Sequence, residues 1–332
     1  MKPISQHDIA EASGVSASTV SRVLTNSPLI SEATRQRVRE VMDRLNYYPS
    51  LAARSLVTQR TYALGVVSPF IADAFAGHIF AGADSVAAEN GYHILATFSH
   101  GLSEEQDLIK RFVRERRADA LIVLNLNLPA EFLANLARDN MPIISVGKPA
   151  VERGIPSVSI ANGPGSFELM NHMLNHGYRD IAIFTGPTGS HDGRERLAAC
   201  LGAAQVAGCT LPGDRILTGD FSSGSGERLM TELLDSGKKL PEAIVALNDA
   251  MAIGAMNVMH QRGLTAPRDI AIAGFDDIEA VDLLGLTTVR VPRHMMGREA
   301  AKLALRCLNG EIPSPSLSII PAELVIRQSC GC

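Results

Sequence analysis

From Tyr62 onward, short apolar runs alternate with amphipathic segments, and this alternation limits the fold more than any other feature of the sequence. A run of four or five apolar residues is typical of a strand buried on both faces, and an amphipathic segment between two such runs is typical of a crossover helix. The pattern therefore predicts two successive α/β units, each built on a doubly wound parallel sheet. The expected strands are 63–67, 93–96, 120–124 and 142–146 in the first unit, and 181–184, 243–247 and 270–273 in the second.

The expected helices lie between these runs. They fall near 76–89, 103–117, 130–139, 165–176, 194–207, 226–236 and 249–262. A helix near 295–308 and the strands after it must then close the fold. A chain of 332 residues is longer than one hydrophobic core usually organises, so we expect more than one domain.

The first sixty residues differ in charge from the rest of the chain. They carry eight basic and five acidic side chains, a net charge of +3. Because the whole chain carries −4, the remainder carries −7. A basic segment joined to an acidic body is typical of a nucleic-acid-binding module, because Lys and Arg are needed only where phosphates are contacted. The charge distribution by itself is also compatible with a basic surface that only aids solubility.

This basic segment contains a predicted helix, a turn at Gly14, and a second helix that begins after Ser16. Apolar residues of the second helix form one stripe, and its other face is small and polar and ends in Arg22. A helix-turn-helix unit of this kind fits the major groove, where a guanidinium can bind guanine. A third helix is expected over 31–45, and an ordinary three-helix surface domain is the alternative. The candidate DNA contacts are Ser16, Ala17, Ser18, Thr19, Ser21 and Arg22.

Several short runs match one protein family in order and spacing. They are DIAE at 8–11, GVS at 14–16, TVSRVL at 19–24, Ser-x-x-Thr-Arg at 31–35 and NYYPSLAARSL at 46–56. In these runs the sequence closely resembles the lactose/galactose repressor family of bacterial transcription regulators. The likeness continues at lower density to about Arg327.

The resemblance implies an N-terminal all-α helix-turn-helix DNA-binding domain, a hinge helix, and an α/β core like the periplasmic sugar-binding proteins, with two doubly wound subdomains. We expect the headpiece at 1–46, the hinge helix and linker at 47–60, the effector-binding and dimerisation core at 61–329 and a tail at 330–332. Within the core, the N-subdomain is expected at about 61–160 plus 292–322, and the C-subdomain at about 161–291 plus 323–329.

The resemblance also implies that the hinge helix folds on the operator and wedges a Leu into the minor groove. Leu56 stands at that position, and Ser50 and Ala53 are candidate contacts on the same helix. An apolar wedge is physically reasonable, since the cost of unstacking a base step is recovered through contacts with bent DNA. The alternative is that Ala52, Ala53 and Leu56 form the apolar face of an ordinary connecting helix.

Ligands of open parallel sheets lie beyond the carboxyl ends of the strands, and polar residues follow several of the expected strands. By position, Asn125, Arg196, Asn248 and Asp276 match residues that commonly contact the effector in the family, and Phe221 falls where an aromatic often stacks. The candidate effector contacts are Asp73, Phe75, Asn125, Asp192, Arg196, Phe221, Asn248 and Asp276.

Some of these residues have a plainer interpretation. Asn248 and Asp249 could only cap the following helix, and one of Asp276 and Asp277 is expected to be solvated. Gly147, Val291 and Arg293 depart from residues found in sugar-responsive relatives, which predicts that the ligand is held differently. Because Arg196 and Arg293 are both cationic, an acidic or phosphorylated sugar is an alternative ligand.

The sequence predicts neither a metal site nor a cofactor. The five Cys are too scattered for a disulfide framework or a zinc site, and Cys330 and Cys332 are expected in a solvated tail. His176 and His191 are expected at the surface, because no second His or Cys is taken to stand at ligand spacing. Motifs for hydrolases, phosphate loops, dinucleotide binding and metalloproteases are missing, so we expect no catalytic residues and no enzyme. Neither a signal peptide nor a membrane span is indicated, which favours the cytoplasm and its nucleoid.

The residues and the resemblance together predict a ligand-responsive repressor of carbohydrate uptake or catabolism genes. We expect a homodimer that binds a palindromic operator and is released by a small sugar or sugar derivative. No leucine heptad follows Arg327, so a tetramer is not expected. A sugar-binding module that no longer reads DNA specifically, and a regulator that uses a purine or nucleoside as corepressor, are the alternatives.

Overall fold

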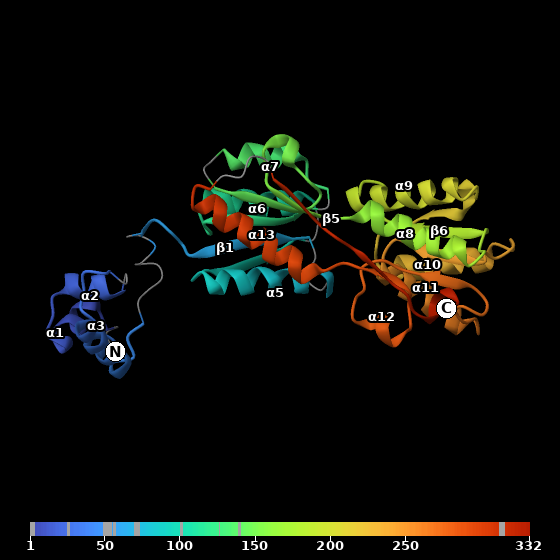
Figure 1. The fold of residues 1–332 in the computed structure, drawn as a ribbon. Coiled ribbons are helices and arrows are strands. Elements are labelled where there is room, and N and C mark those ends of the chain that lie inside the picture. The colour runs from blue at the N-terminus through green and yellow to red at the C-terminus, as the bar shows by residue number, and fades with distance from the viewer. Residues whose placement is uncertain are drawn as a thin grey trace. The chain divides into compact units, whose positions relative to one another are not determined.

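The computed structural model describes residues 4–24, 27–48, 55, 58–69, 74–99, 102–125, 127–138, 141–311 and 316–332. Contacts divide the chain into two compact units, Met1–Thr61 and Tyr62–Cys332 (Figure 1). Among the described residues, no helix is both long and apolar enough to cross a membrane.

The described residues of the first unit include the helices α1 (Gln6–Ser13), α2 (Ala17–Leu24) and α3 (Glu32–Arg44). Ser5 and Asp8 form a capping box at the start of α1, and Gly14 ends that helix with φ 67°, a left-handed conformation that favours glycine. Ser16 accepts a hydrogen bond from the Thr19 amide at 3.1 Å and so begins α2. The helix-turn-helix prediction is confirmed. The buried apolar core of this unit consists of Ile9, Ala10, Val20, Val23, Val38 and Val41.

The N-terminal half of the second unit is a six-stranded parallel sheet with the order β11-β5-β4-β3-β1-β2. Its strands are β1 (Ala63–Ser68), β2 (His93–Phe98), β3 (Ala120–Asn125), β4 (Ile143–Gly147), β5 (Ser157–Ile160) and β11 (Leu317–Ile320). Helices α6 (Leu102–Arg114) and α7 (Ala130–Ala137) lie on one face, and α5 (Ala74–Glu89) and α13 (Arg293–Leu308) lie on the other (Figure 1).

The prediction that 93–96 forms a buried strand is wrong in one respect. Residues 93–98 do form strand β2, but it lies at an edge of the sheet and its side chains are exposed or half-buried. Its apolar composition is that of a central strand, whereas its place in the strand order leaves one edge uncovered.

The C-terminal half of the second unit is a four-stranded parallel sheet with the order β7-β6-β8-β9. Helices α8 (Asn162–Asn175) and α9 (His191–Val206) cover one face, and α10 (Ser223–Asp235) and α11 (Asp249–Gln261) cover the other (Figure 1). A short helix, α12 (Ala280–Leu283), follows the sheet. The strands are β6 (Ile181–Thr185), β7 (Ile216–Thr218), β8 (Ala243–Ala246) and β9 (Ala271–Ala273).

Three connections join the two halves. They run from β5 to α8, from β10 (Thr288–Arg290) to α13, and from β11 to β12 (Glu323–Val325), and β10 pairs with β12 in an antiparallel ribbon. A Cβ atom at Gly165 of α8 would contact Val289, Ala322 and Phe275, so the three connections are closely packed. Short single-turn helices are η1 (Val151–Arg153), η2 (Gly213–Arg215) and η3 (Gln328–Cys330).

In each half, a pair of helices meets through glycines. A Cβ atom at Gly297 of α13 would overlap the Ile79 carbonyl of α5, and one at Gly82 would overlap the His294 carbonyl. Likewise, a Cβ atom at Gly254 of α11 would overlap the Ser223 carbonyl of α10. The backbones of these helices therefore lie in contact, which only glycine allows.

Candidate functional site

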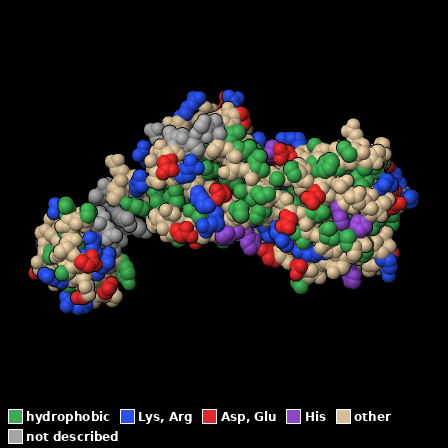
Figure 2. All heavy atoms as spheres, in the orientation of Figure 1, with side chains coloured by type: hydrophobic (Ala, Val, Ile, Leu, Met, Phe, Trp, Pro, Cys, Tyr) green, Lys and Arg blue, Asp and Glu red, His purple; other side chains and the backbone are tan. Residues whose placement is uncertain are grey.

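The outward face of α2 carries the predicted DNA contacts. Ser16, Ala17, Ser18 and Arg22 are exposed, and Thr19 and Ser21 are half-buried. The Ser16 hydroxyl lies 2.8 Å from that of Ser18 and 2.9 Å from that of Thr19, a polar cluster at the start of the helix. The opposite face is the apolar stripe buried in the core of the unit. Figure 2 shows Lys and Arg side chains on the surface of this unit.

Two groups of predicted contacts lie outside the described residues. Ser50, Ala53 and Leu56 of the expected hinge helix are one group, and Asp73 is the other. Their roles stay predictions.

Arg196 of α9 is the most constrained of the predicted effector residues. It is only 3% exposed. Its Nε donates to Asn162 Oδ1 at 2.8 Å, and its Nη1 donates to the Leu247 carbonyl at 2.7 Å and lies 3.2 Å from Asp276 Oδ1. The guanidinium carbon stands 3.8 Å from the centroid of the Phe275 ring, a cation–π contact. Three elements therefore hold one cation in a single orientation.

Asn248 lies just after the carboxyl end of β8 and connects it to α11 and to Phe221. Its Oδ1 accepts from the Met251 amide at 3.0 Å, so Asn248 caps α11, and its Nδ2 donates to the Phe221 carbonyl at 2.8 Å. Phe221 has φ 71°, and its ring covers Gly186, where a Cβ atom would overlap it. The amide and the aromatic ring are thus positioned by each other and by the turn after β6.

Asn162 joins two predicted residues and was missed by the sequence analysis. Its Nδ2 donates to Asp192 Oδ1 at 2.9 Å and to Glu195 Oε2 at 3.2 Å, while its Oδ1 accepts from Arg196. It begins α8 directly after β5, a strand that the apolar pattern did not reveal. A buried polar residue at a strand-to-helix junction was the available signal.

Asp249 is fully buried beside this group. It accepts hydrogen bonds from Thr288 Oγ1 at 2.6 Å and from the Ile278 amide at 3.0 Å. Burial, and next the nearby Asp276 carboxylate, raise the pKa of Asp249 well above its ordinary value. Asp249 therefore holds the crossover strand β10 and the loop after β9, while Asn248 is the cap.

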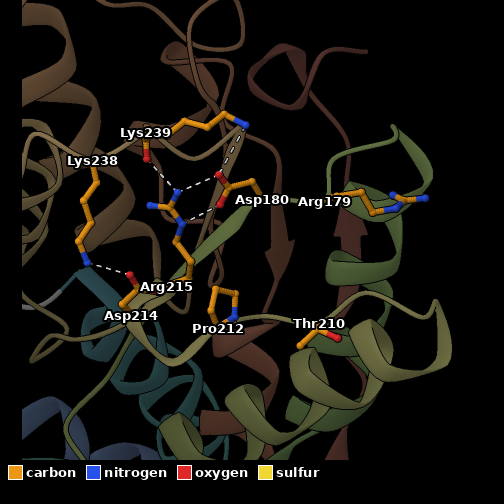
Figure 3. A pocket seen from close by; sticks show the side chains of 8 residues that line it. All are labelled: Arg179, Asp180, Thr210, Pro212, Asp214, Arg215, Lys238 and Lys239. Atoms are coloured by element: carbon orange, nitrogen blue, oxygen red, sulfur yellow. Dashed lines mark hydrogen bonds and ion pairs between the residues drawn. The ribbon is translucent and has the colours of Figure 1, made fainter.

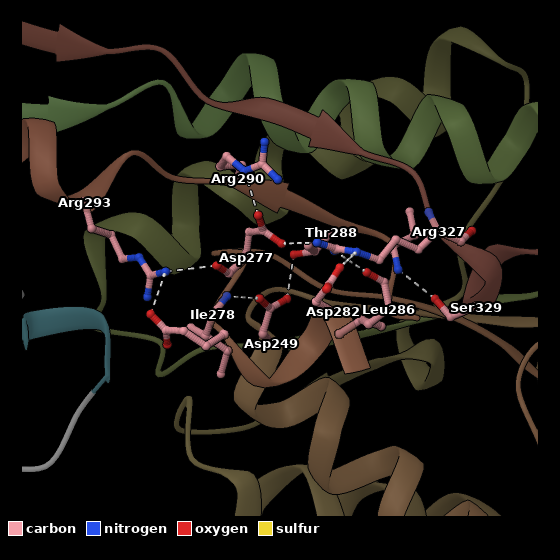
Figure 4. Close-up of polar contacts among 12 residues, drawn as sticks. Asp249, Asp277, Ile278, Asp282, Leu286, Thr288, Arg290, Arg293, Arg327 and Ser329 are labelled. Atoms are coloured by element: carbon pink, nitrogen blue, oxygen red, sulfur yellow. Dashed lines mark hydrogen bonds and ion pairs between the residues drawn. The ribbon is translucent and has the colours of Figure 1, made fainter. Parts of the chain in front are cut away.

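The expectation that Asp276 or Asp277 is solvated is wrong. Their side chains are 12% and 10% exposed, and both residues adopt positive φ, 116° and 52°. The Asp277 carboxylate accepts from Arg290 Nε at 2.7 Å and Arg327 Nη2 at 2.8 Å, and its carbonyl accepts from Arg293 Nη2 at 2.9 Å (Figure 4). One aspartate thus binds three arginines, two at the connection from β10 to α13 and one after β12.

Contacts across the two halves extend this group toward α5. The Arg293 guanidinium lies 5.9 Å from the centroid of the Phe75 ring, and His78 contacts Glu279. Asn125 ends β3 in register with Gly147 of β4. The structure therefore joins Arg196 directly to Asp276 and, through Asn162, to Asp192. It joins Asn248 to Phe221, beside the Leu247 carbonyl that Arg196 binds. Phe75 is linked through Arg293 to Asp277, the neighbour of Asp276 in the chain.

A cavity of about 450 Å³ lies away from these residues. Its lining side chains come from segments just before β6, β7 and β8, at the amino ends of the strands (Figure 3). Arg215 forms two hydrogen bonds to the Asp180 carboxylate, at 2.6 and 2.8 Å, and Lys238 pairs with Asp214 at 2.8 Å. Ligands of parallel sheets bind at the opposite edge, so this cavity is an ion-paired surface hollow rather than the predicted effector site.

The prediction of a solvated Cys330–Cys332 tail is wrong for Cys330, whereas Cys332 is exposed, as expected. Cys330 is fully buried, and its Sγ lies 3.3 Å from Nε2 of His172. His176 is exposed, as expected, but its Nε2 lies 3.1 Å from Sγ of Cys332. The expectation that no second His stands at ligand spacing is wrong, since His172 lies four residues before His176. The two cysteines could not be joined to this pair from the sequence, because they are more than 150 residues away.

Both units match known protein families. Residues 6–50 match the family described as bacterial regulatory proteins, lacI family, and residues 170–330 match the periplasmic binding protein-like domain. The HTH-type transcriptional repressor CytR of Escherichia coli (strain K12) is 30% identical over 325 residues, which cover 97% of this chain and 95% of CytR. The HTH-type transcriptional regulator GalR of the same strain is 32% identical over 330 residues, covering 97% and 94%.

Solved structures are similar to this chain over nearly its whole length. A crystal structure of the lac repressor dimer bound to operator and the anti-inducer ONPF matches with a TM-score of 0.88 and 26% identity, covering 99% of both chains. A complex of the transcriptional regulator CelR with cellobiose matches with a TM-score of 0.74 and 27% identity, covering 98% of this chain and 99% of that one.

Proposed function

The chain belongs to the lacI family of bacterial regulatory proteins, and from this premise we propose that it represses genes of carbohydrate uptake or catabolism and is released from its operator by a small sugar or sugar derivative. The observation that carries the proposal is the joint presence of a helix-turn-helix face on α2 and a buried polar cluster at the carboxyl ends of a parallel sheet. We place the protein with the nucleoid in the cytoplasm.

We propose that α2 reads the operator. Its small exposed side chains allow the helix backbone to approach the floor of the major groove, and the Arg22 guanidinium can donate two hydrogen bonds to one guanine. Ser16, Ser18, Thr19 and Ser21 supply hydroxyls for phosphates and bases. The hinge helix, with Leu56 as its wedge, would complete the contact at the centre of a palindrome. Leu56→Ala is then expected to weaken operator binding and leave ligand affinity unchanged, and unchanged operator affinity would remove the wedge.

We propose that the effector binds against Arg196, Asn248, Asp276 and Phe221. The cation and the carboxylate are held within 3.2 Å of each other, so together they offer a donor and an acceptor to a pair of neighbouring hydroxyls. The Phe221 ring supplies an apolar wall for a sugar face. The CelR–cellobiose complex, a structural neighbour, supports a carbohydrate as the ligand class.

We propose that Asp277 and the arginines it binds, Arg290, Arg293 and Arg327, which together are called the Asp277 group, transmit effector binding to the DNA. Asp276, an expected effector contact, precedes Asp277, which holds arginines at the connection from β10 to α13 and after β12. A ligand that moves Asp276 therefore changes the segments on which the two halves turn. Ligand and operator then oppose each other through a reciprocal coupling of roughly 1–3 kcal/mol or more.

We propose a homodimer as the active form. A palindromic operator requires two recognition helices related by a twofold axis. The lac repressor neighbour is a dimer. Edge strand β2 exposes Leu95, with 38% of its surface accessible, and an apolar sheet edge of this kind is suited to burial against a second copy.

The experiment that tests this function is selection of genomic fragments by the purified protein at moderate salt, followed by sequencing. Enrichment of one palindrome beside transport or catabolic genes supports the proposal. The affinity for that palindrome should fall steeply with salt yet stay far above that for random DNA. Weak binding without sequence preference would instead identify a sugar-binding module that has lost specific DNA reading.

A further inference from the structure

Two histidines and two cysteines meet where the end of α8 contacts residues 328–332. His172 and His176 are four residues apart and lie on the same side of the helix, and Cys330 and Cys332 approach that side from η3. The distance from His172 Nε2 to Cys330 Sγ is 3.3 Å, and that from His176 Nε2 to Cys332 Sγ is 3.1 Å. Cys332 Sγ also lies 3.8 Å from His172 Nε2, and one donor atom from each residue lies within 4.8 Å of all the others.

The cluster is held in place by contacts that do not involve the four donor atoms. Tyr178 donates its hydroxyl proton to the Cys330 carbonyl at 3.0 Å. The Ser329 hydroxyl donates to the Ile272 carbonyl at 2.6 Å and accepts from the Thr287 amide at 2.8 Å. Gly331 then turns the chain at φ 100°, so that Cys332 returns toward the helix. Both cysteines are therefore positioned by the sheet and by Tyr178 before any ligand arrives.

The spacing of the donor atoms fits one tetrahedral ion. With Zn–S bonds of about 2.3 Å and Zn–N bonds of about 2.0 Å, neighbouring ligand atoms of a tetrahedral site lie about 3.3–3.8 Å apart. The three distances given above, from 3.1 to 3.8 Å, are close to that range. Two thiolates with two imidazoles are a ligand set that selects zinc over magnesium or calcium, which prefer oxygen.

The surroundings suit a metal-bound thiolate. The Thr287 hydroxyl lies 3.1 Å from Cys330 Sγ and can donate a hydrogen bond to it. Residues next to metal ligands commonly make such hydrogen bonds, which orient the ligand. Cys330 is buried, whereas Cys332 and His176 are exposed, so the site has an anchored side and an open side through which an ion can enter. The other described cluster of potential ligands, His191, Asp192 and Glu195, has no thiol, and two of its carboxylates already bind Asn162.

We propose that His172, His176, Cys330 and Cys332 bind one zinc ion. Binding releases the two thiol protons to solvent and leaves the ion with four protein ligands, the closed coordination of a structural site. The ion joins the end of α8 to the segment that follows Arg327, the arginine bound to Asp277. It therefore fastens the C-terminal half of the core near the connections on which the effector response depends.

The test uses the full chain, purified under reducing conditions and stripped with a strong chelator. Zinc is added alone, with magnesium as a second arm, and binding is followed by competition with a chromophoric chelator. Cobalt replaces zinc in a parallel titration, because tetrahedral cobalt with thiolate ligands gives characteristic visible and charge-transfer bands. We expect one zinc ion per chain, no magnesium binding, and a cobalt spectrum of a tetrahedral site with two thiolates.

The exposed ligands give variants that should fold normally. Cys332→Ser and His176→Gln are each expected to weaken zinc binding by on the order of tenfold or more. Cys307→Ser, at a half-buried cysteine elsewhere in the chain, is the matched control and should bind zinc as the unaltered protein does. Each variant is checked by its circular dichroism spectrum. Absence of stoichiometric zinc, a cobalt spectrum without thiolate bands, an equal loss in Cys307→Ser, or a Cys330–Cys332 disulfide that persists under the reducing conditions would overturn the proposal.

Discussion

Replacing Asp277 by Asn tests the claim that this residue holds the connections between the two halves of the core. Asn is nearly isosteric and tolerates the observed φ of 52°, so the substitution removes the charge and little else. The contact with Arg327 is the larger loss, because those side chains are only 13% and 10% exposed. Arg290 is 49% exposed, and such a pair contributes less than about 1 kcal/mol.

The magnitude follows from these two contacts. Breaking a buried ion pair costs about 3–5 kcal/mol. Arg327 keeps other partners, the Leu286 carbonyl at 2.8 Å and Asp282 at 3.2 Å, which lowers the cost. We therefore expect Asp277→Asn to reduce the free energy of unfolding by about 2–3 kcal/mol.

Urea denaturation followed by circular dichroism measures this quantity, with Arg290→Gln as the control that removes only the exposed pair. We expect the control to lose less than about 1 kcal/mol. If Asp277→Asn destabilised the core no more than Arg290→Gln, the Asp277 group would not hold the connections, and its part in the effector response would fail with it.

Three further predictions concern other parts of the chain. Arg22→Ala should weaken binding to the selected operator by about 1–3 kcal/mol in a fluorescence anisotropy titration, and an equal loss on random DNA would reassign Arg22 to a phosphate. Burial raises the pKa of Glu105 to about 7. The folded chain therefore binds more protons than the unfolded chain between about pH 4.5 and 7, and about 1–3 kcal/mol of stability is lost as the pH rises through that window. Glu105→Gln should remove this dependence in urea titrations at both ends of the window, and an unchanged dependence would contradict the assignment. Gly297→Ala should lower the free energy of unfolding by about 2–4 kcal/mol because its Cβ would overlap the backbone of α5. Gly202→Ala on α9, where an added Cβ would contact nothing, should instead raise it by about 0.5–1 kcal/mol, and similar effects of the two substitutions would refute the close packing.

The fold could be predicted where its signals are local. The helices of the first unit were visible because capping residues, a turn glycine and a 3.6-residue apolar period all lie within a few residues of one another. Strands made of apolar runs were visible, including β8 and β9, which have only four and three residues. β5, β7, β10 and β12 are as short but contain polar side chains, and pairing with distant strands defines them, so local composition did not reveal them. The exposure of β2 likewise depends on the order of the strands in the sheet, and the residues of β2 themselves do not indicate that order.

The same division applies to the candidate site. Arg196, Asn248 and Asp276 were found because carboxyl ends of parallel strands meet at one edge. The grouping of arginines around Asp277 depends on three segments that are distant in sequence, as does the approach of Cys330 to His172, 158 positions away. The residue types alone indicated neither the contacts of Asp277 with its arginines nor the contact of Cys330 with His172, since charged residues and cysteines are also common where they form no such group.

Effector and operator are expected to bind to one protein with opposing, reciprocal effects. The most direct measurement titrates the selected operator with the protein, alone and with each member of a panel of sugars, sugar phosphates and nucleosides, and then titrates the active compound with and without operator. We expect one compound to weaken operator binding by about tenfold or more, and operator to weaken binding of that compound by the same factor. A compound that binds the core without changing operator affinity, or two factors that differ, would contradict the account.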